Sequence, residues 1–170
     1  LNRVRVMKMM TQFMARLRRP LVAASSLAVF AGLSPVLAQS ANFDGITLSA
    51  YPPAGASVEG RTVGSYSLSN IASSDGSGNL CAGFADTNPD HILTLESDFP
   101  SLTVTVNSGQ DTTILMQGPN DNSVYCGQDI SRANLDAQIV SSNLQAGTYR
   151  IWVGAHNQGQ RFSYSLTVAE

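Results

Sequence analysis

Residues 102–106 read Leu-Thr-Val-Thr-Val, and this alternation decides the fold class. The first, third and fifth side chains of such a segment face one side of an extended strand, and the threonines face the other side. The same period of two recurs in three other segments, 91–95, 149–153 and 162–168. Each of these segments is predicted to be a half-buried β-strand.

Turn-forming residues separate the strand segments, as in Asn-Ser-Gly-Gln-Asp at 107–111 and Gly-Pro-Asn-Asp-Asn at 118–122. Ile-Leu-Met at 114–116 is apolar on both faces and predicts a more central strand. Weaker strand patterns lie near 45–49, 61–68, 123–126 and 137–141. The one place for a turn of helix is 131–138. About eight short strands joined by such turns predict an all-β, antiparallel β-sandwich.

The charges of the 170-residue chain are unevenly distributed. Six of its ten basic residues lie in the first 19 positions, and all twelve acidic residues lie from Asp44 onward. From Gln39 to the end, four arginines stand against twelve acids, a net charge of −8. Because binding to phosphates or anionic lipids needs clustered Lys and Arg, this composition excludes a nucleic-acid binder and a partner of acidic membranes.

The N-terminal part has the pattern of an export signal. Arg-Leu-Arg-Arg at 16–19 precedes a mostly apolar, uncharged run at 21–33, and Val36 and Ala38 stand just before Gln39. This pattern predicts a signal peptide over 1–38. The apolar run is short for a membrane span, which needs about 20 residues, and an uncleaved anchor is the alternative. Residues 1–13 are interpreted as an over-extended start.

After cleavage, the chain is expected to be periplasmic or extracellular and not inserted in a membrane. Residues 39–60 are expected to be a lead-in segment, and 61–170 are expected to form a single domain, for which the length suffices. Cys81 and Cys126 are the only cysteines. Export favours a disulfide between them, which would stabilise the fold by roughly 4 kcal/mol. A metal site on the two cysteines is the alternative, although they lack CxxC spacing.

Several segments from Asp90 onward follow one another in a characteristic order. Asp-Thr-Thr-Ile-Leu at 111–115 is followed by Gly-Pro-Asn-Asp at 118–121, and Gly-Thr-Tyr-Arg-Ile-Trp-Val-Gly closes the series at 147–154. Residues 60–170 thereby resemble the bacterial pre-peptidase C-terminal (PPC) domain. The resemblance implies a jelly-roll-like β-sandwich. Such domains usually follow the catalytic part of secreted proteases, and some bind calcium or a polymeric substrate.

No protease domain stands ahead of the PPC-like segment in this sequence, so the resemblance predicts a fold and a compartment but no catalytic activity. A serine-hydrolase site needs a Ser, a His and an acid held together. The only histidines are His91, on a strand, and His156, in a loop. The Ser-Asp-Gly-Ser-Gly segment at 74–78 lacks the context of a nucleophile elbow. We therefore expect no enzyme. The hydrolase alternative requires one histidine within hydrogen-bond reach of both a Ser and an acid.

Acids and amides gather in the turns. Asp111, Asp121 and Asp129 flank two consecutive connections, and the loops 75–79 and 86–90 space oxygen-bearing side chains two residues apart. Hard oxygen ligands suit Ca²⁺, and the PPC resemblance points the same way. The first three residues are therefore the candidate calcium ligands, with no cofactor expected to be required. The alternative is that Asp and Asn serve as turn formers whose side chains accept backbone N–H bonds.

Trp152 alternates out of phase with Tyr149 and Ile151, so it is predicted to lie on the opposite face of its sheet. An exposed Trp152 could stack on a sugar ring or a partner protein, whereas a covered sheet would bury it. We expect an exported, non-catalytic accessory or binding module of the cell envelope or extracellular space. Its partner would be an envelope or extracellular protein or a polysaccharide. The rival hypotheses are a carbohydrate-binding module and a secreted hydrolase or peptidase-associated protein.

Overall fold

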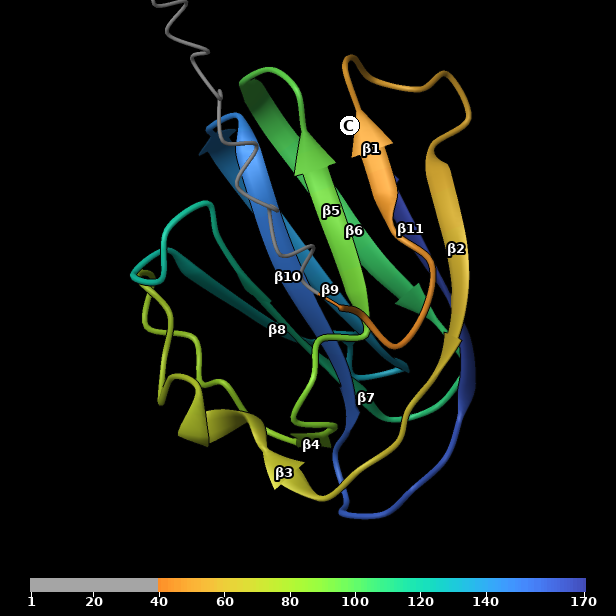
Figure 1. Ribbon diagram of the computed structural model, residues 1–170. Coiled ribbons are helices and arrows are strands. Elements are labelled where there is room, and N and C mark those ends of the chain that lie inside the picture. The colour runs from red at the N-terminus through yellow and green to blue at the C-terminus, as the bar shows by residue number, and fades with distance from the viewer. Residues whose placement is uncertain (1–39) are drawn as a thin grey trace, which may run out of the picture. The chain divides into compact units, whose positions relative to one another are not determined.

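The segments with a period of two form β-strands in the computed structural model, which describes residues 40–170 (Figure 1). The predicted signal peptide lies outside the described residues. No described helix is long and apolar enough to cross a membrane. The elements are β1 (Ile46–Leu48), β2 (Ala56–Arg61), β3 (Tyr66–Ser67), the 3₁₀ helix η1 (Leu68–Asn70), β4 (Phe84–Ala85), β5 (His91–Leu95), β6 (Phe99–Asn107), β7 (Thr112–Gln117), β8 (Val124–Ser131), β9 (Asn134–Leu144), β10 (Gly147–Ala155) and β11 (Ser163–Ala169).

The strands pair in the order β1-β5-β10-β7-β8-β9-β6-β11-β2. All these pairs are antiparallel except β1 with β5, which is parallel. The end strands of this path, β1 and β2, lie side by side (Figure 1). The sandwich is therefore a sheet nearly closed into a barrel. The all-β prediction is confirmed, with eleven strands where about eight were expected.

β8 is the corner at which the sheet turns from one layer to the other. Its first half pairs with β7, where Leu115 lies opposite Cys126, and its second half pairs with β9, where Gln138 lies opposite Gln128. The turn occurs at Gly127. A Cβ atom there would lie 2.0 Å from the carbonyl oxygen of Gln138, so only glycine lets the two backbones approach this closely.

The main core lies between the two layers and is made of the apolar side chains predicted to point inward. Leu102, Val104 and Val106 on β6 are at most 1% exposed, as are Tyr149 and Ile151 on β10. The alternation in the sequence therefore indicated correctly which face of each strand is buried.

A smaller second core lies on the outer face of the β10–β7 layer. The segment containing β3, η1 and β4 crosses this face (Figure 1) and buries Leu68 against Leu115 and Trp152. Cys81 and Cys126 form the predicted disulfide within this core, with their Cα atoms 5.2 Å apart. β3 lies within the weak strand pattern near 61–68, whereas the two-residue β4 was not predicted, because so short a segment has no detectable period.

Two other expectations differ from the structure. The 131–138 segment, where a helical turn was allowed, forms the end of β8, a tight turn and the start of β9. Residues 39–60, expected as a lead-in with a weak strand pattern near 45–49, contribute β1 at that pattern and also most of β2 to the sheet. Both segments are polar or rich in small residues, so their strand conformation depends on pairing with distant strands more than on their own pattern.

Candidate functional site

A groove opens where β8 and β9 diverge. Beyond the Gln128–Gln138 pair, β8 continues along β7 while β9 continues along β6, so the two strands separate. The groove has a volume of about 530 Å³ and is lined by the 75–80 loop, by residues 125–129 of β8 and by residues 138–142 of β9. We call it the β8–β9 groove. Its volume is in the range of ligand sites, about 300–1,000 Å³.

The 75–80 loop forms one wall of the groove, and the Asp75 carboxylate holds this loop in place. Oδ1 accepts the backbone N–H groups of Ser77 and Asn79, both at 2.9 Å. Oδ2 accepts the Asn79 side-chain amide at 2.9 Å and the backbone N–H of Cys126, on β8, at 3.2 Å. Partial burial acts to raise the pKa of Asp75, but the hydrogen bonds outweigh it and lower the pKa below its usual value.

The same loop is tied to β8 at two more points. The Cys81–Cys126 disulfide anchors the end of the loop, and the Gln128 side-chain amide donates to the Leu80 carbonyl at 3.2 Å. The Asp75 bond satisfies a Cys126 N–H that points away from β7, so the loop covers the free edge of β8. This wall of the groove is therefore preformed by contacts within the protein itself.

The opposite wall is the edge of β9. Residues 138–144 of β9 pair with β6, but β8 pairs with β9 only from Asn134 to Gln138. Among the described residues, no strand pairs with the other edge of β9 from residue 139 onward. Ile139 is buried in the core, whereas the Val140 side chain is 72% exposed on the groove side of the molecule.

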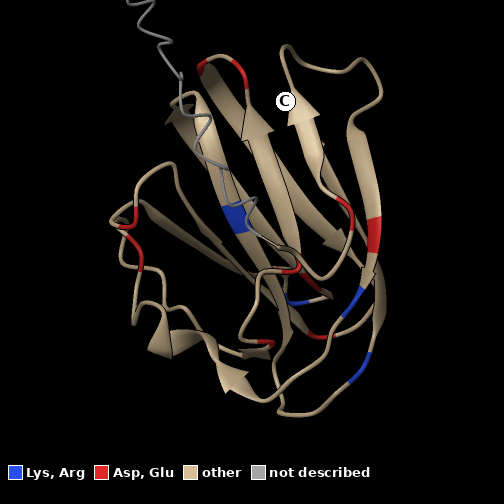
Figure 2. Ribbon diagram, in the orientation of Figure 1, with Lys and Arg blue, Asp and Glu red and all other residues tan. Residues whose placement is uncertain are grey.

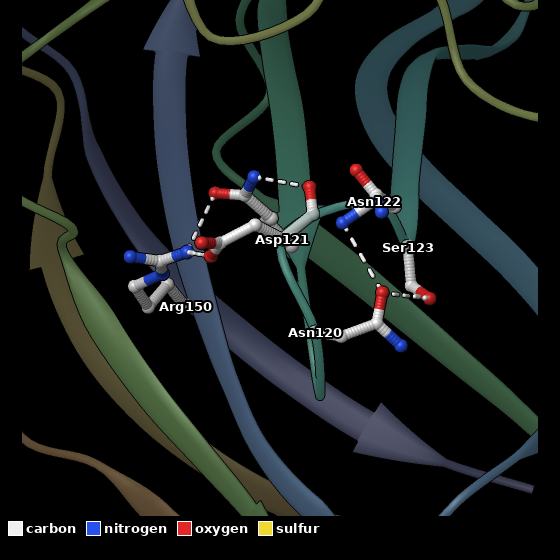
Figure 3. Close-up of polar contacts among 6 residues, drawn as sticks. Asn120, Asp121, Asn122, Ser123 and Arg150 are labelled. Carbon is white, nitrogen blue, oxygen red and sulfur yellow. Dashed lines mark hydrogen bonds and ion pairs between the residues drawn. The ribbon is translucent and has the colours of Figure 1, made fainter.

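The three candidate calcium ligands do not come together. Asp121 lies in the β7–β8 turn, where its carboxylate pairs with Arg150 (Figure 3). Asp111 and Asp129 lie at the other end of the same two strands, because β7 and β8 are antiparallel with Gln117 opposite Val124 near the turn. The three residues therefore do not lie together in the structure, because Asp121 is separated from the other two by the length of a hairpin.

No group of three or more His, Cys, Asp or Glu residues in 40–170 is placed to hold a metal ion. Acidic residues lie mostly in the connections between strands (Figure 2), and the side chains of several accept backbone N–H bonds there. Asp86 accepts from Asn88 at 3.0 Å, and Asp136 accepts from Ser108 and Gly109, both at 2.8 Å. These acids act as turn formers in the structure.

Trp152 lies on the face opposite Tyr149, as its phase predicted, but it is only 5% exposed. The second core covers its ring, and its Nε1 donates to the Thr87 carbonyl at 3.4 Å. The structure therefore corrects the idea of Trp152 as an exposed ligand-binding residue. The covering segment comes from β3, η1 and β4, which the sequence pattern did not reveal.

Neither histidine forms a catalytic arrangement among the described residues. His91 is 1% exposed; its Nδ1 donates to the Asp44 carbonyl at 2.6 Å, and its Nε2 accepts from the Tyr164 hydroxyl at 2.9 Å. Burial lowers the pKa of His91, which favours this neutral state. His156 is exposed, and its backbone N–H bonds to the carbonyl of Asp111. No serine hydrogen-bonds to either imidazole in the described structure.

Asp90, next to His91, is fully buried and caps a second strand edge. Its Oδ2 accepts the Val153 N–H on β10 at 2.8 Å, just beyond the last β5–β10 pair, and its Oδ1 accepts from Asn42 at 3.2 Å. Burial raises the pKa of Asp90 to about 7, against the lowering effect of these two hydrogen bonds.

The β8–β9 groove is not evident from the sequence. The oxygen spacing of residues 75–79 is the available signal, and by itself it indicates only a weak ligand set. In the structure, the donors of Ser77 and Asn79 turn toward Asp75 instead.

No protein-family model matches the chain, and no curated protein matches it. Among solved structures, the chain is similar to the pre-peptidase C-terminal domain of collagenase from Bacillus anthracis, with 13% identity over 73% of this chain and 93% of that chain and a TM-score of 0.36. It is also similar to Aeromonas hydrophila PliG, a periplasmic lysozyme inhibitor of g-type lysozyme, with 15% identity over 74% and 97% of the two chains and a TM-score of 0.36. The first of these two structures is a PPC domain, the family that residues 60–170 resemble in their sequence motifs.

Proposed function

We propose that this chain is an exported, non-catalytic binding module that holds a partner in the β8–β9 groove. The observation that carries this proposal is the placement of exposed apolar side chains. The four large apolar residues that the described part of the chain exposes all lie on the groove loop, β8 or β9: Leu80, Ile130, Leu135 and Val140. Two of them, Leu80 and Val140, line the groove itself, and exposed apolar side chains at a preformed groove are typical of an interaction site.

Two further observations support the proposal. The Cys81–Cys126 disulfide fixes one wall of the groove, and such bonds persist in oxidising compartments outside the cytoplasm. The two histidines, which a hydrolase would need, are occupied by a carbonyl and a tyrosine or exposed in a loop. With Trp152 buried, the carbohydrate-binding alternative loses its stacking surface.

Site-specific photo-crosslinking in the host tests this function. A photoreactive amino acid replaces Leu80, at the groove, or Glu59, which is exposed on β2 as a matched control. We expect a discrete adduct from position 80, in the periplasmic or secreted fraction, and none from position 59. Equal labelling at both positions, or none at either, would contradict the groove as the binding site.

The same preparations test export and the absence of catalysis. N-terminal sequencing of the exported protein should begin at Gln39. Purified protein should cleave neither casein nor simple esters, and hydrolysis that disappears in a His91→Gln or His156→Gln variant would overturn the non-catalytic part of the proposal.

A further inference from the structure

The outer edge of β9 carries unused backbone hydrogen-bonding groups. In an antiparallel strand, alternate residues turn both their N–H and C=O groups toward the same neighbour. Residues 139–142 have β6 on one side and the groove on the other. About every second residue of this stretch therefore points a donor and an acceptor into the groove, which is a template for another strand.

Two other free edges of the sheet, on β2 and on β8, are protected, and this one is not. β2, at the end of the sheet, carries Glu59 and Arg61, and charged side chains discourage edge pairing. The exposed stretch of β8 is covered by the Asp75 loop. By contrast, residues 139–144 read Ile-Val-Ser-Ser-Asn-Leu, without a charge or a proline.

We propose that the β8–β9 groove receives an extended peptide segment of a partner protein, which pairs with residues 139–142 as an added strand. This inference rests on the proposed binding function and names the partner's chemistry. Main-chain bonds would supply much of the affinity, as in other cases of strand addition.

The space between the walls of the groove fits a single extended strand better than the β9 edge of a second copy of this protein. A second β9 would arrive joined to its own β6 along its far edge. That far edge would have to occupy the space of the 75–80 loop, which the disulfide and Asp75 hold in place. A single extended segment, free on both edges, fits between the walls.

The side chains of the groove specify the peptide further. Val140 and Leu80, which are 72% and 66% exposed, offer apolar contacts on either side of the strand. Asp129 is exposed at the groove and takes no part in an ion pair within the described residues, where Asp121–Arg150 is the only such pair. We therefore infer a segment with small or apolar residues at alternate positions, no acids, and a Lys or Arg near one end.

The test uses heptapeptides displayed on phage and selected on the whole oxidised protein. Selected peptides are resynthesised with a single N-methyl group at each backbone nitrogen in turn, and their affinities are measured by fluorescence polarisation. N-methylation removes one donor and leaves the side chains unchanged. Strand addition predicts a loss of at least tenfold at alternate positions and a small change at the positions between them.

Two variants locate the binding. Val140→Lys places a charge on the open edge and should reduce affinity at least tenfold without shifting the melting temperature. Ser57→Lys, the matched control on the edge strand β2, should bind the peptide as the unaltered protein does.

If peptides bind in a Val140-dependent way but N-methylation shows no alternation, strand addition is wrong while the groove remains a binding site. If no selected peptide depends on Val140, strand addition is also overturned. Photo-crosslinking at Leu80 then decides the proposed function separately.

Discussion

The two walls of the β8–β9 groove treat their backbone groups in opposite ways. On β8, the Cys126 N–H that points away from the sheet is bonded to the Asp75 carboxylate, and a disulfide holds the covering loop. On β9, residues 139–142 have neither a loop nor a charge over their outer edge. This contrast between a covered and an uncovered strand edge is the observation from which we infer strand addition at β9.

The same covering device occurs inside the molecule. Asp90 caps the Val153 N–H on β10 just as Asp75 caps Cys126 on β8. The two caps differ in burial, and their pKa values shift in opposite directions as a result. Each cap can be removed separately by substitution, so the contribution of each capped strand edge, on β8 and on β10, can be measured on its own.

Removing the disulfide should have the largest effect. Reduction removes the covalent link between the end of the 75–80 loop and β8, and it opens a long loop in the unfolded chain. We therefore expect a loss of about 4 kcal/mol in the free energy of unfolding. Urea denaturation of the oxidised and the reduced protein measures this loss on one and the same sequence. The Cys81→Ala/Cys126→Ala double variant, insensitive to reductant, is the control. A loss below about 1 kcal/mol would mean that other contacts hold this wall.

Asp90, the buried cap, should make the free energy of unfolding depend on pH. Between about pH 4 and 7 folded Asp90 keeps its proton, which the unfolded chain has released. The Asp90 contribution to stability is therefore largest below about pH 4 and falls as pH rises toward 7. The expected slope is about 1.4 kcal/mol per pH unit. The lowered pKa of His91 acts oppositely, removing stability as pH falls below about 6.5.

Denaturation of Asp90→Asn at pH 5, 6 and 7 measures the Asp90 contribution. The variant should lose the downward slope and be more stable, relative to the unaltered protein, at pH 7 than at pH 5. Glu59→Gln, at an exposed site on β2, should leave the slope unchanged. An unchanged slope in Asp90→Asn would show that Asp90 is ionised in the folded protein throughout this range.

Asp75, the partly exposed cap, should contribute less than Asp90 to the free energy of unfolding. Asp75→Ala removes four hydrogen bonds at a partly exposed carboxylate, and we expect a loss of about 1–2 kcal/mol at pH 7. Because the folded pKa of Asp75 is lowered, this contribution is present above about pH 4 and is lost as pH falls further. Asp121→Ala, which removes an exposed ion pair with Arg150, should change the unfolding curve little. Equal effects of the two variants would contradict the capping role of Asp75.

The smallest effect should come from calcium. The acidic side chains in the turns bond to backbone N–H groups and form no cluster of three in the described part of the chain. Thermal melts with EDTA, with Ca²⁺ and with Mg²⁺ at matched ionic strength should therefore show the same small response to both ions, through screening of the acidic surface. A larger shift with Ca²⁺ alone would reveal a specific site.

The sequence indicated the fold class because its evidence is local. Alternation in 102–106 and 162–168 identified the buried faces of β6 and β11, and export chemistry indicated the disulfide. The face on which Trp152 lies was also evident locally. The sequence did not show that the segment of β3, η1 and β4 packs over this face and covers the ring. The candidate calcium set failed because sequence proximity does not reveal which end of a hairpin a residue occupies.

The groove could not be predicted for a related reason. It exists because β8 changes partners at Gly127, and a glycine in a strand does not by itself reveal a corner. The main target of the Asp75 carboxylate outside its own loop is the amide of Cys126, 51 residues away in the chain. Contacts at that separation follow from the pairing of the whole sheet rather than from spacing in one segment.

Amide hydrogen exchange of the free, oxidised protein, resolved by residue with NMR, tests the contrast between the two edges most directly. We expect alternate amides within residues 139–142 to exchange at nearly unprotected rates, while those that bond to β6 exchange slowly. The Cys126 amide should be protected, and Asp75→Ala should release it. Uniform protection across 139–142 in the monomer, or an unprotected Cys126 amide in the unaltered protein, would contradict an open β9 edge beside a covered β8 edge.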